Sequence, residues 1–241
     1  MKKKLWILGI IGSLLIITGC EEENTNVQER QNILDDGVTM SYTYTDIKGE
    51  AIVEELLSKI RMPIGSTDED LFYKNKKLTY QDISNDDLLL LGANIYKTAN
   101  PEATSMTVED MNKSIHSIIT NEVEVKHKSV KDDNCDKTYV ELKGINYDLS
   151  GNCKKGNGEY ISTIITADDV NNTGIEIAEK VAYVETNGNE KIIYREKNGK
   201  EIKRVNINEE LNLENTTGLI IVKYTFVMYK DEYYFYSSEI I

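Results

Sequence analysis

Histidine is the side chain best suited to acid–base catalysis near neutral pH, and the chain has two, His116 and His127. Nucleophilic catalysis also needs a serine, a cysteine or a similar group beside the activating base. The motifs G-x-S-x-G, S-x-x-K and H-E-x-x-H are all absent from the sequence. Either histidine could serve as a base, but the sequence predicts no catalytic residue and favours a protein that is not an enzyme.

The first twenty residues divide into a basic start, Met1–Lys4, an uncharged apolar run, Leu5–Ile17, and the sequence Ile17-Thr18-Gly19-Cys20. The apolar run has 13 residues, whereas a membrane-spanning helix needs about 20, so it suits a signal peptide better. The last four residues resemble the lipobox of bacterial lipoproteins. This resemblance implies cleavage after residue 19 and a diacylglycerol on the Cys20 sulfur, with added palmitate or a similar acyl chain. It also implies that the protein is anchored to the extracytoplasmic face of the cell membrane.

Cysteine usage agrees with that location. With Cys20 taken by lipid, Cys135 and Cys153 remain as an even pair in an oxidising compartment. Their spacing predicts a disulfide whose loop would contribute about 3 kcal/mol in the chain-entropy model. Two reduced thiols are the alternative. A zinc site made with the two histidines lacks the tight ligand spacing of structural zinc sites, so no metal site is predicted there.

Acidic loops around the cysteines partly match a calcium-binding loop. Positions 1, 3, 5 and 12 of such a loop are matched by Asp148, Ser150, Asn152 and Glu159. A second, poorer match consists of Asp132, Asn134 and Asp136, with Lys143 where the bidentate glutamate belongs. The glycine required at position 6 of the first loop is replaced by Cys153. We therefore predict no bound cofactor or metal, and weak calcium binding is the alternative.

Aromatic residues form the remaining candidate site. All 15 tyrosines follow residue 40, and the last 20 residues are especially rich in aromatic rings. The crowded positions are Tyr224, Phe226, Tyr229, Tyr233, Tyr234, Phe235 and Tyr236. Such rings could stack on sugars or anchor a protein partner. Alternatively, they fill the pleated, half-buried surface of a sheet.

The charge balance excludes some partners. The chain has 28 basic and 41 acidic side chains, a formal charge of −13. Removing residues 1–19 takes away three lysines and no acid, so the exported part carries −16. An acidic surface disfavours nucleic acids, anionic lipids and anionic wall polymers, because phosphate groups are met by Lys and Arg. The expected partners are the membrane, through lipid on Cys20, and a protein or a wall component.

Three helices are predicted in the first half of the exported part. Residues 50–60 carry an apolar stripe at helical spacing and are followed by Pro63. Two more helices begin after Ser84 and at Thr107, each with an aspartate three residues later as a capping-box partner. The buried face of the last helix is predicted to comprise Val108, Met111, Ile115, Ile118 and Ile119.

Strand patterns dominate from residue 123. Runs at 137–142, 159–166 and 176–186 are rich in β-branched and aromatic residues. Asn187-Gly188 and Asn198-Gly199 predict the turns of a three-stranded meander, and Lys230-Asp231 joins a final hairpin. Helices followed by antiparallel strands indicate an α+β fold with helices packed on a curved sheet, in cystatin-like or nuclear-transport-factor-like order.

The predicted organisation is a signal peptide at 1–19, a flexible tether at 20–40, a helical part at 41–121 and a β-rich part at 122–241, the last two forming one domain. The exported layout is similar to that of uncharacterised lipoproteins of low-GC Gram-positive bacteria. We expect a non-enzymatic binding or structural role at the cell envelope. The alternatives are an envelope hydrolase or transferase without a recognisable motif, and an inhibitor or immunity-type lipoprotein.

Lipidation gives the first prediction. Metabolic labelling with a radioactive or clickable fatty acid should label the wild-type protein and leave Cys20→Ala unlabelled, because the alanine variant has no sulfur for the lipid. Cys135→Ala is the matched control and should keep the label. Labelling that survives in Cys20→Ala would refute the anchor.

Overall fold

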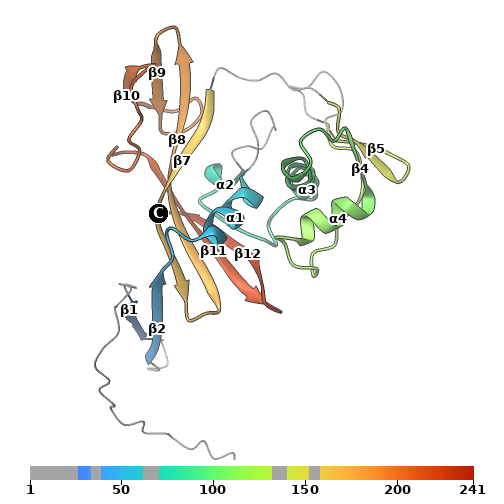
Figure 1. Ribbon diagram of the computed structural model, residues 1–241, viewed down its shortest axis with the longest axis horizontal. Coiled ribbons are helices and arrows are strands. Elements are labelled where there is room, and N and C mark those ends of the chain that lie inside the picture. The colour runs from blue at the N-terminus through green and yellow to red at the C-terminus, as the bar shows by residue number, and fades with distance from the viewer. Residues whose placement is uncertain (1–26, 34–38, 62–70, 132–139, 152–157) are drawn as a thin grey trace, which may run out of the picture.

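The computed structural model describes residues 27–33, 39–61, 71–131, 140–151 and 158–241 of the chain. Cys20, Cys135 and Cys153 lie outside these ranges, and so do the predicted lipid attachment and disulfide. The described residues form an α+β structure with few helices and a large antiparallel sheet, as the sequence indicated (Figure 1).

The large sheet has nine strands among the described residues, all paired antiparallel. They are β1 (Val27–Ile33), β2 (Thr39–Asp46), β3 (Lys77–Thr79), β7 (Gly158–Val170), β8 (Gly174–Asn187), β9 (Glu190–Tyr194), β10 (Glu201–Asn206), β11 (Ile220–Tyr229) and β12 (Glu232–Ile240). The main order is β1-β2-β7-β8-β11-β12-β3, and β9 and β10 extend from the second half of β8. A small second sheet has the order β4-β6-β5. Its strands are β4 (Ser105–Thr107), β5 (Glu141–Lys143) and β6 (Asn146–Asp148).

The described helices are α1 (Ala51–Ile60), α2 (Leu71–Lys74), α3 (Asn85–Ala99) and α4 (Val108–His116). The predicted caps are confirmed. The Ser84 hydroxyl accepts from the Asp87 amide at 3.2 Å, and Thr107 and Asp110 form a reciprocal capping box. Helix α4 ends at His116, whereas its apolar face was predicted to continue to Ile119. Ile118 and Ile119 are buried, as predicted, but they are not helical.

Hairpin turns lie where the sequence predicted them. Gly188 and Asn198 have positive φ angles of 59° and 61°, at the two meander turns. Lys230 and Asp231 both have positive φ, 53° and 66°, as a two-residue hairpin turn between right-twisted strands requires. A three-residue turn, 171–173, joins β7 to β8, and its first two residues have positive φ angles of 55°. These two residues are asparagines, which tolerate the left-handed region better than most residues.

Several short strands were not predicted from the sequence. Strand β1 lies inside the stretch expected to be a tether and pairs with β2. The three-residue strands β3 and β4 come from the predicted helical part, and they pair with β12 and β6 of the predicted β-rich part. Three residues are too few to display a period of two, so pairing with a distant strand decides their conformation. The two parts of the chain therefore share both sheets.

The main core lies between one face of the large sheet and the helices. Strands β8 and β11 supply alternate residues, such as Ile177 and Phe226, and α1 supplies Leu56 and Leu57. Helices α1 and α2 lie next to the sheet, while α3, α4 and the small sheet lie farther out (Figure 1). A smaller cluster on the other sheet face includes Val184. Because of this cluster, residues 181–184 of β8 are buried on both faces of the sheet.

Close packing of α3 against α4 gives a stability prediction. A Cβ on Gly92 would lie 2.6 Å from Ile115 Cγ1 and 2.7 Å from Met111 Sδ, both in fully buried side chains. Gly92→Ala should therefore destabilise the fold by about 1–3 kcal/mol, because overpacking forces the helices apart. Urea unfolding followed by circular dichroism measures this. Gly49→Ala is the matched control, since no atom lies within 4 Å of its added Cβ. Equal stability of the two variants would contradict the prediction.

Candidate functional site

A carboxylate lies at the centre of the large sheet. Glu179 is on β8 between Ile177 and Val181, on the face that packs against the helices, and its exposed fraction is 0%. Burying an ionised carboxylate is costly unless a cation and hydrogen bonds compensate it. Sequence reasoning missed this residue, although the alternation Ile175, Ile177, Glu179, Val181 places an acid at an inward position.

Arg61, the residue directly after α1, pairs with this carboxylate. Its Nη2 contacts Glu179 Oε1, and its Nη1 bonds Glu54 Oε2 at 3.2 Å. The Ser162 hydroxyl on β7 donates to Glu179 Oε1 at 2.8 Å. Burial is the largest single influence on the pKa of Arg61 and lowers it, but the charge of Glu179, the hydrogen bond to it and the charge of Glu54 together raise the pKa above its ordinary value. The end of α1 is thereby bound electrostatically to the middle of the sheet.

Two buried phenols lie near the ion pair. Burial, followed by the charge of Glu179, raises the pKa of Tyr73 on α2. Burial and the nearby Tyr73 also raise the pKa of Tyr224 on β11, so both phenols stay protonated. Glu179 Oε2 and Arg61 Nε are buried and make no hydrogen bond within the described part of the chain.

An open depression of about 600 Å³ borders this cluster. Its lining comprises Lys48, Glu54, Arg61 and residues 160–164 of β7. Solvent reaches part of Arg61 there, with 34% of its side chain exposed, whereas Glu179 stays covered. The depression carries a mixture of opposite charges that already pair with one another or with neighbours. We therefore interpret the Glu179 cluster as a structural element.

A second hollow lies at the end of the final hairpin, and we call it the aromatic groove. It is lined by Tyr80, Thr120, Asn121, Glu122, Val227, Met228, Tyr229, Lys230, Tyr234, Phe235 and Tyr236, and its volume is about 420 Å³. Three separate segments build it: the turn after β3, the loop after α4, and the β11–β12 hairpin. The Ile118 carbonyl accepts from the Phe235 amide at 2.8 Å, and the Tyr236 carbonyl accepts from the Tyr80 amide at 3.0 Å. These bonds hold the three segments together.

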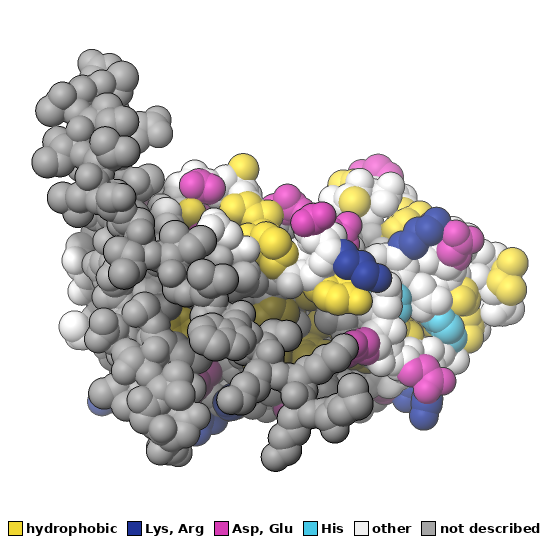
Figure 2. Space-filling view, turned by 90° about the horizontal axis from the view of Figure 1, so that it is seen from below, with side chains coloured by type: hydrophobic (Ala, Val, Ile, Leu, Met, Phe, Trp, Pro, Cys, Tyr) yellow, Lys and Arg dark blue, Asp and Glu magenta, His cyan; other side chains and the backbone are white. Residues whose placement is uncertain are grey.

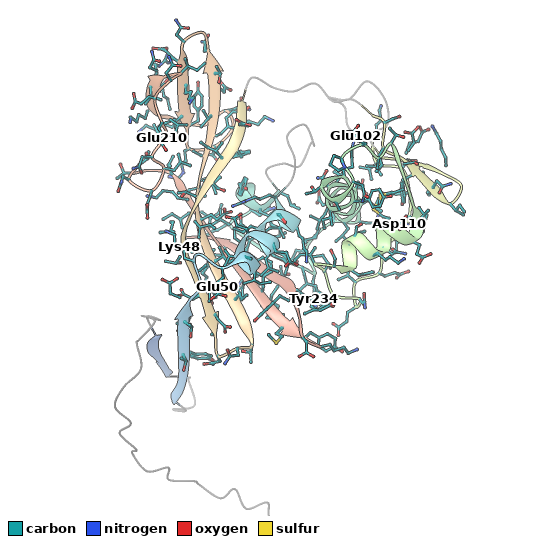
Figure 3. The ribbon with its side chains drawn as sticks, viewed as in Figure 1. Lys48, Glu50, Glu102, Asp110, Glu210 and Tyr234 are labelled. Carbon is teal, nitrogen blue, oxygen red and sulfur yellow. The ribbon has the colours of Figure 1, made fainter. Side chains whose placement is uncertain are left out.

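Tyrosine rings dominate the walls of the groove. Tyr80 and Tyr236 lie with ring centroids 6.1 Å apart, and Tyr229 and Tyr234 lie 6.4 Å apart. The Tyr234 hydroxyl donates to Glu232 at 2.7 Å. This bond, more than burial, raises the pKa of Tyr234. Figure 3 labels Tyr234 beside the β11–β12 hairpin.

The aromatic residues predicted from the sequence thus separate into two groups. Tyr224, Phe226 and Phe235 are fully buried and belong to the core. Tyr229 and Tyr236 are exposed by 56% and 48% and line the groove. Core packing is confirmed for the first group, and the interpretation of the exposed rings as a binding platform stays a prediction. Sequence reasoning did not identify Tyr80 or residues 120–122, because they come from elsewhere in the chain.

The two histidines make structural hydrogen bonds. His116 Nδ1 lies 3.3 Å from the Ile119 carbonyl, just after the end of α4. His127 Nδ1 lies 2.9 Å from the hydroxyl of Tyr147, a buried residue of β6. Burial lowers the pKa of His127, which favours the neutral ring. Neither contact joins a histidine to a nucleophile.

The calcium-loop matches are only partly covered by the described residues. Asp148 Oδ1 accepts from the Ser150 amide at 2.9 Å and its hydroxyl at 2.5 Å, and Oδ2 contacts Lys143 Nζ at 2.9 Å. The Ser150 hydroxyl and then Lys143 lower the pKa of Asp148. This carboxylate is therefore occupied by a turn and a lysine, and Glu159 is exposed on β7. Asp132, Asn134, Asp136 and Asn152 lie outside the described ranges.

The described residues contain neither a metal-binding cluster nor a membrane-spanning helix. Within the described ranges, no group of three or more His, Cys, Asp or Glu side chains is arranged to hold a metal ion. In the same ranges, no helix has the length and apolar character needed to cross a membrane. Comparison with protein-family models, curated proteins and solved structures gives no match for this chain.

The buried ion pair gives a testable prediction. Arg61→Met leaves the Glu179 carboxylate buried without its cation and should cost about 3–5 kcal/mol of unfolding free energy. Arg61→Met/Glu179→Leu should recover most of this loss, because it removes both charges. Urea denaturation measures the three proteins.

Arg204→Met is the matched control for the ion pair. Arg204 pairs with Glu190 at 2.8 Å and with Glu201 at 3.0 Å, and all three side chains are exposed. Its loss should therefore cost less than about 1 kcal/mol. If the two arginine substitutions cost the same, the central role of Arg61 is refuted.

Proposed function

We propose that this chain is a lipid-anchored extracytoplasmic protein that binds a ligand at the aromatic groove and catalyses no reaction. The groove carries the proposal. Its volume of about 420 Å³ lies within the usual range of ligand sites, roughly 300–1,000 Å³. The lipobox resemblance at Cys20 supports the membrane location.

Exposed apolar surface is concentrated at the groove. The described residues have five exposed large hydrophobic side chains, and three of them, Met228, Tyr229 and Tyr236, line it. Figure 2, seen from below, shows hydrophobic side chains at this end of the molecule next to acidic and basic ones. Clustered exposed aromatics with a polar rim are typical of binding sites, whereas single exposed hydrophobics are not.

The groove and the N-terminal strands lie at the same end of the large sheet. Val227 in the groove pairs with Gly174 at the start of β8. The adjoining β7–β8 turn contacts β2, where the Asn171 amide donates to the Thr43 carbonyl at 3.0 Å. Val27 is the seventh residue after Cys20, and seven residues of chain span at most about 25 Å. Lipid on Cys20 would therefore keep the groove near the membrane surface.

The cystatin-like or nuclear-transport-factor-like ordering stays a proposal about the fold. Its support is that α1 and α2 precede β7, β8, β11 and β12 in the chain and lie against one face of these strands. Strands β1, β2 and β3 are additions to that simple order. The hydrogen bonds of His116 and His127 give no support to the hydrolase or transferase alternative.

Ligand binding can be tested with the full chain purified from membranes in detergent. Thermal unfolding should be followed with neutral oligosaccharides, organic ammonium compounds and short peptides as probes. At least one class should raise the melting temperature. In Tyr229→Ser/Tyr236→Ser the affinity for that probe should fall about tenfold or more, since aromatic anchors dominate such sites.

Tyr194→Ser is the matched control for this experiment. It removes a tyrosine of β9, which lies outside the groove, and should leave probe binding unchanged. If no probe class shifts the unfolding temperature, or if the control variant loses binding as strongly as the groove variant, the proposed function is wrong.

A further inference from the structure

The chemistry of the aromatic groove points to one class of ligand. We propose that it binds a small, soluble organic ammonium cation, of which a quaternary ammonium compound is the simplest case. This inference rests on the proposed binding function and specifies its ligand. Three observations carry it: the ring content of the walls, a lysine already held on one ring, and the sign of the surrounding charge.

Four tyrosine rings line the groove, at positions 80, 229, 234 and 236. The face of an aromatic ring carries negative electrostatic potential, so a cation over it is attracted. The attraction survives even when the cation is wrapped in methyl groups, which cannot donate strong hydrogen bonds. Met228 adds a polarizable apolar surface suited to such methyl groups.

One ring of the groove already holds a cation. Lys230 Nζ lies 5.0 Å from the centroid of Tyr229, within the roughly 6 Å over which cation–π attraction operates. Lys230 is a turn residue, and its alkyl chain is flexible enough to move aside. Its ammonium group marks a position where the groove stabilises positive charge, and it also competes with a ligand for that ring.

The charge of the groove favours cations. Among the described residues, Lys230 is the one basic residue that lines the groove, whereas Glu122 is also in the lining and Asp231 and Glu232 lie in and after the hairpin turn. The Glu232 carboxylate accepts from the Tyr234 hydroxyl, which adds electron density to that ring. The whole chain carries −13. An anionic ligand would meet repulsion here, and a neutral sugar could donate hydrogen bonds to the acidic rim but would gain no charge attraction from it.

A soluble ligand fits better than a lipid headgroup. A volume of about 420 Å³ accommodates a compact ammonium compound. A phospholipid headgroup would bring its phosphate close to Glu122 and Asp231, and the acidic chain would be repelled by an anionic bilayer surface.

The test compares two probes of the same shape. In 3,3-dimethyl-1-butanol, an uncharged carbon replaces the charged nitrogen of choline. Isothermal titration of the full chain in detergent should show choline binding at least about tenfold more tightly than the neutral alcohol, because only the cation gains from the rings. Raising the salt concentration should weaken the choline affinity, since part of the attraction comes from exposed carboxylates.

Variants separate a ring effect from a hydroxyl effect. Tyr229→Phe should keep choline affinity within about threefold, whereas Tyr229→Leu should lose about tenfold, because cation–π attraction needs the ring and not the hydroxyl. A sugar site that uses the Tyr229 hydroxyl would instead lose affinity in Tyr229→Phe as well as in Tyr229→Leu, since both changes remove the hydrogen bond. Lys230→Asn should bind choline several-fold more tightly, as it removes the competing cation and asparagine tolerates the positive φ of 53°.

The outcomes distinguish this inference from the function on which it rests. Equal binding of choline and the alcohol, or saturable binding of a neutral oligosaccharide in place of choline, overturns the ammonium inference and leaves the groove a binding site. Binding to phosphatidylcholine vesicles without binding to choline also overturns it. If none of these probes binds and short peptides also leave the unfolding temperature unchanged, both proposals fall.

Discussion

The ion pair between Arg61 and Glu179 is the constraint on which the arrangement of layers depends. A carboxylate in the middle of a sheet face can be buried only if a cation reaches it, and the cation comes from the end of α1. The pair therefore selects one position of the helix on the sheet. It also selects one register of β8, because a slip of one residue would turn Glu179 to the other face. Ser162 and the nearby phenols fill the remaining polar space.

The aromatic groove depends indirectly on the packing of the helices against the large sheet. Helix α1 and α2 cover the face of β8 and β11, and the loop after α4 then lies against the outer edge of β12. The bond from the Phe235 amide to the Ile118 carbonyl joins that loop to the hairpin. Phe235 is fully buried in the core and also borders the groove, which its neighbours Tyr234 and Tyr236 line. One strand thus anchors the groove to the core and supplies its walls.

Local patterns predicted the elements that depend on local interactions. The caps at Ser84 and Thr107, the apolar stripe of α1 and the turns at Gly188 and Lys230 all act within a few residues. The short strands β3 and β4 were missed because each is decided by a partner far away in the sequence. Glu179 was missed for the same reason, because its burial depends on pairing with Arg61, which is far away in the sequence. The contribution of Tyr80 to the groove was missed for this reason too.

The sequence by itself determined the acid excess, the chemistry of the first twenty residues on which the anchor prediction is based, three helices and the main hairpins. These follow from composition or from interactions between near neighbours. Only the tertiary structure decided which aromatic side chains are buried and which are exposed, and which carboxylate is paired inside the core. Exposure and ion pairing depend on what packs against a residue. In this chain, the arginine that pairs with Glu179 and the ring that lies beside Tyr236 come from segments more than 100 residues away.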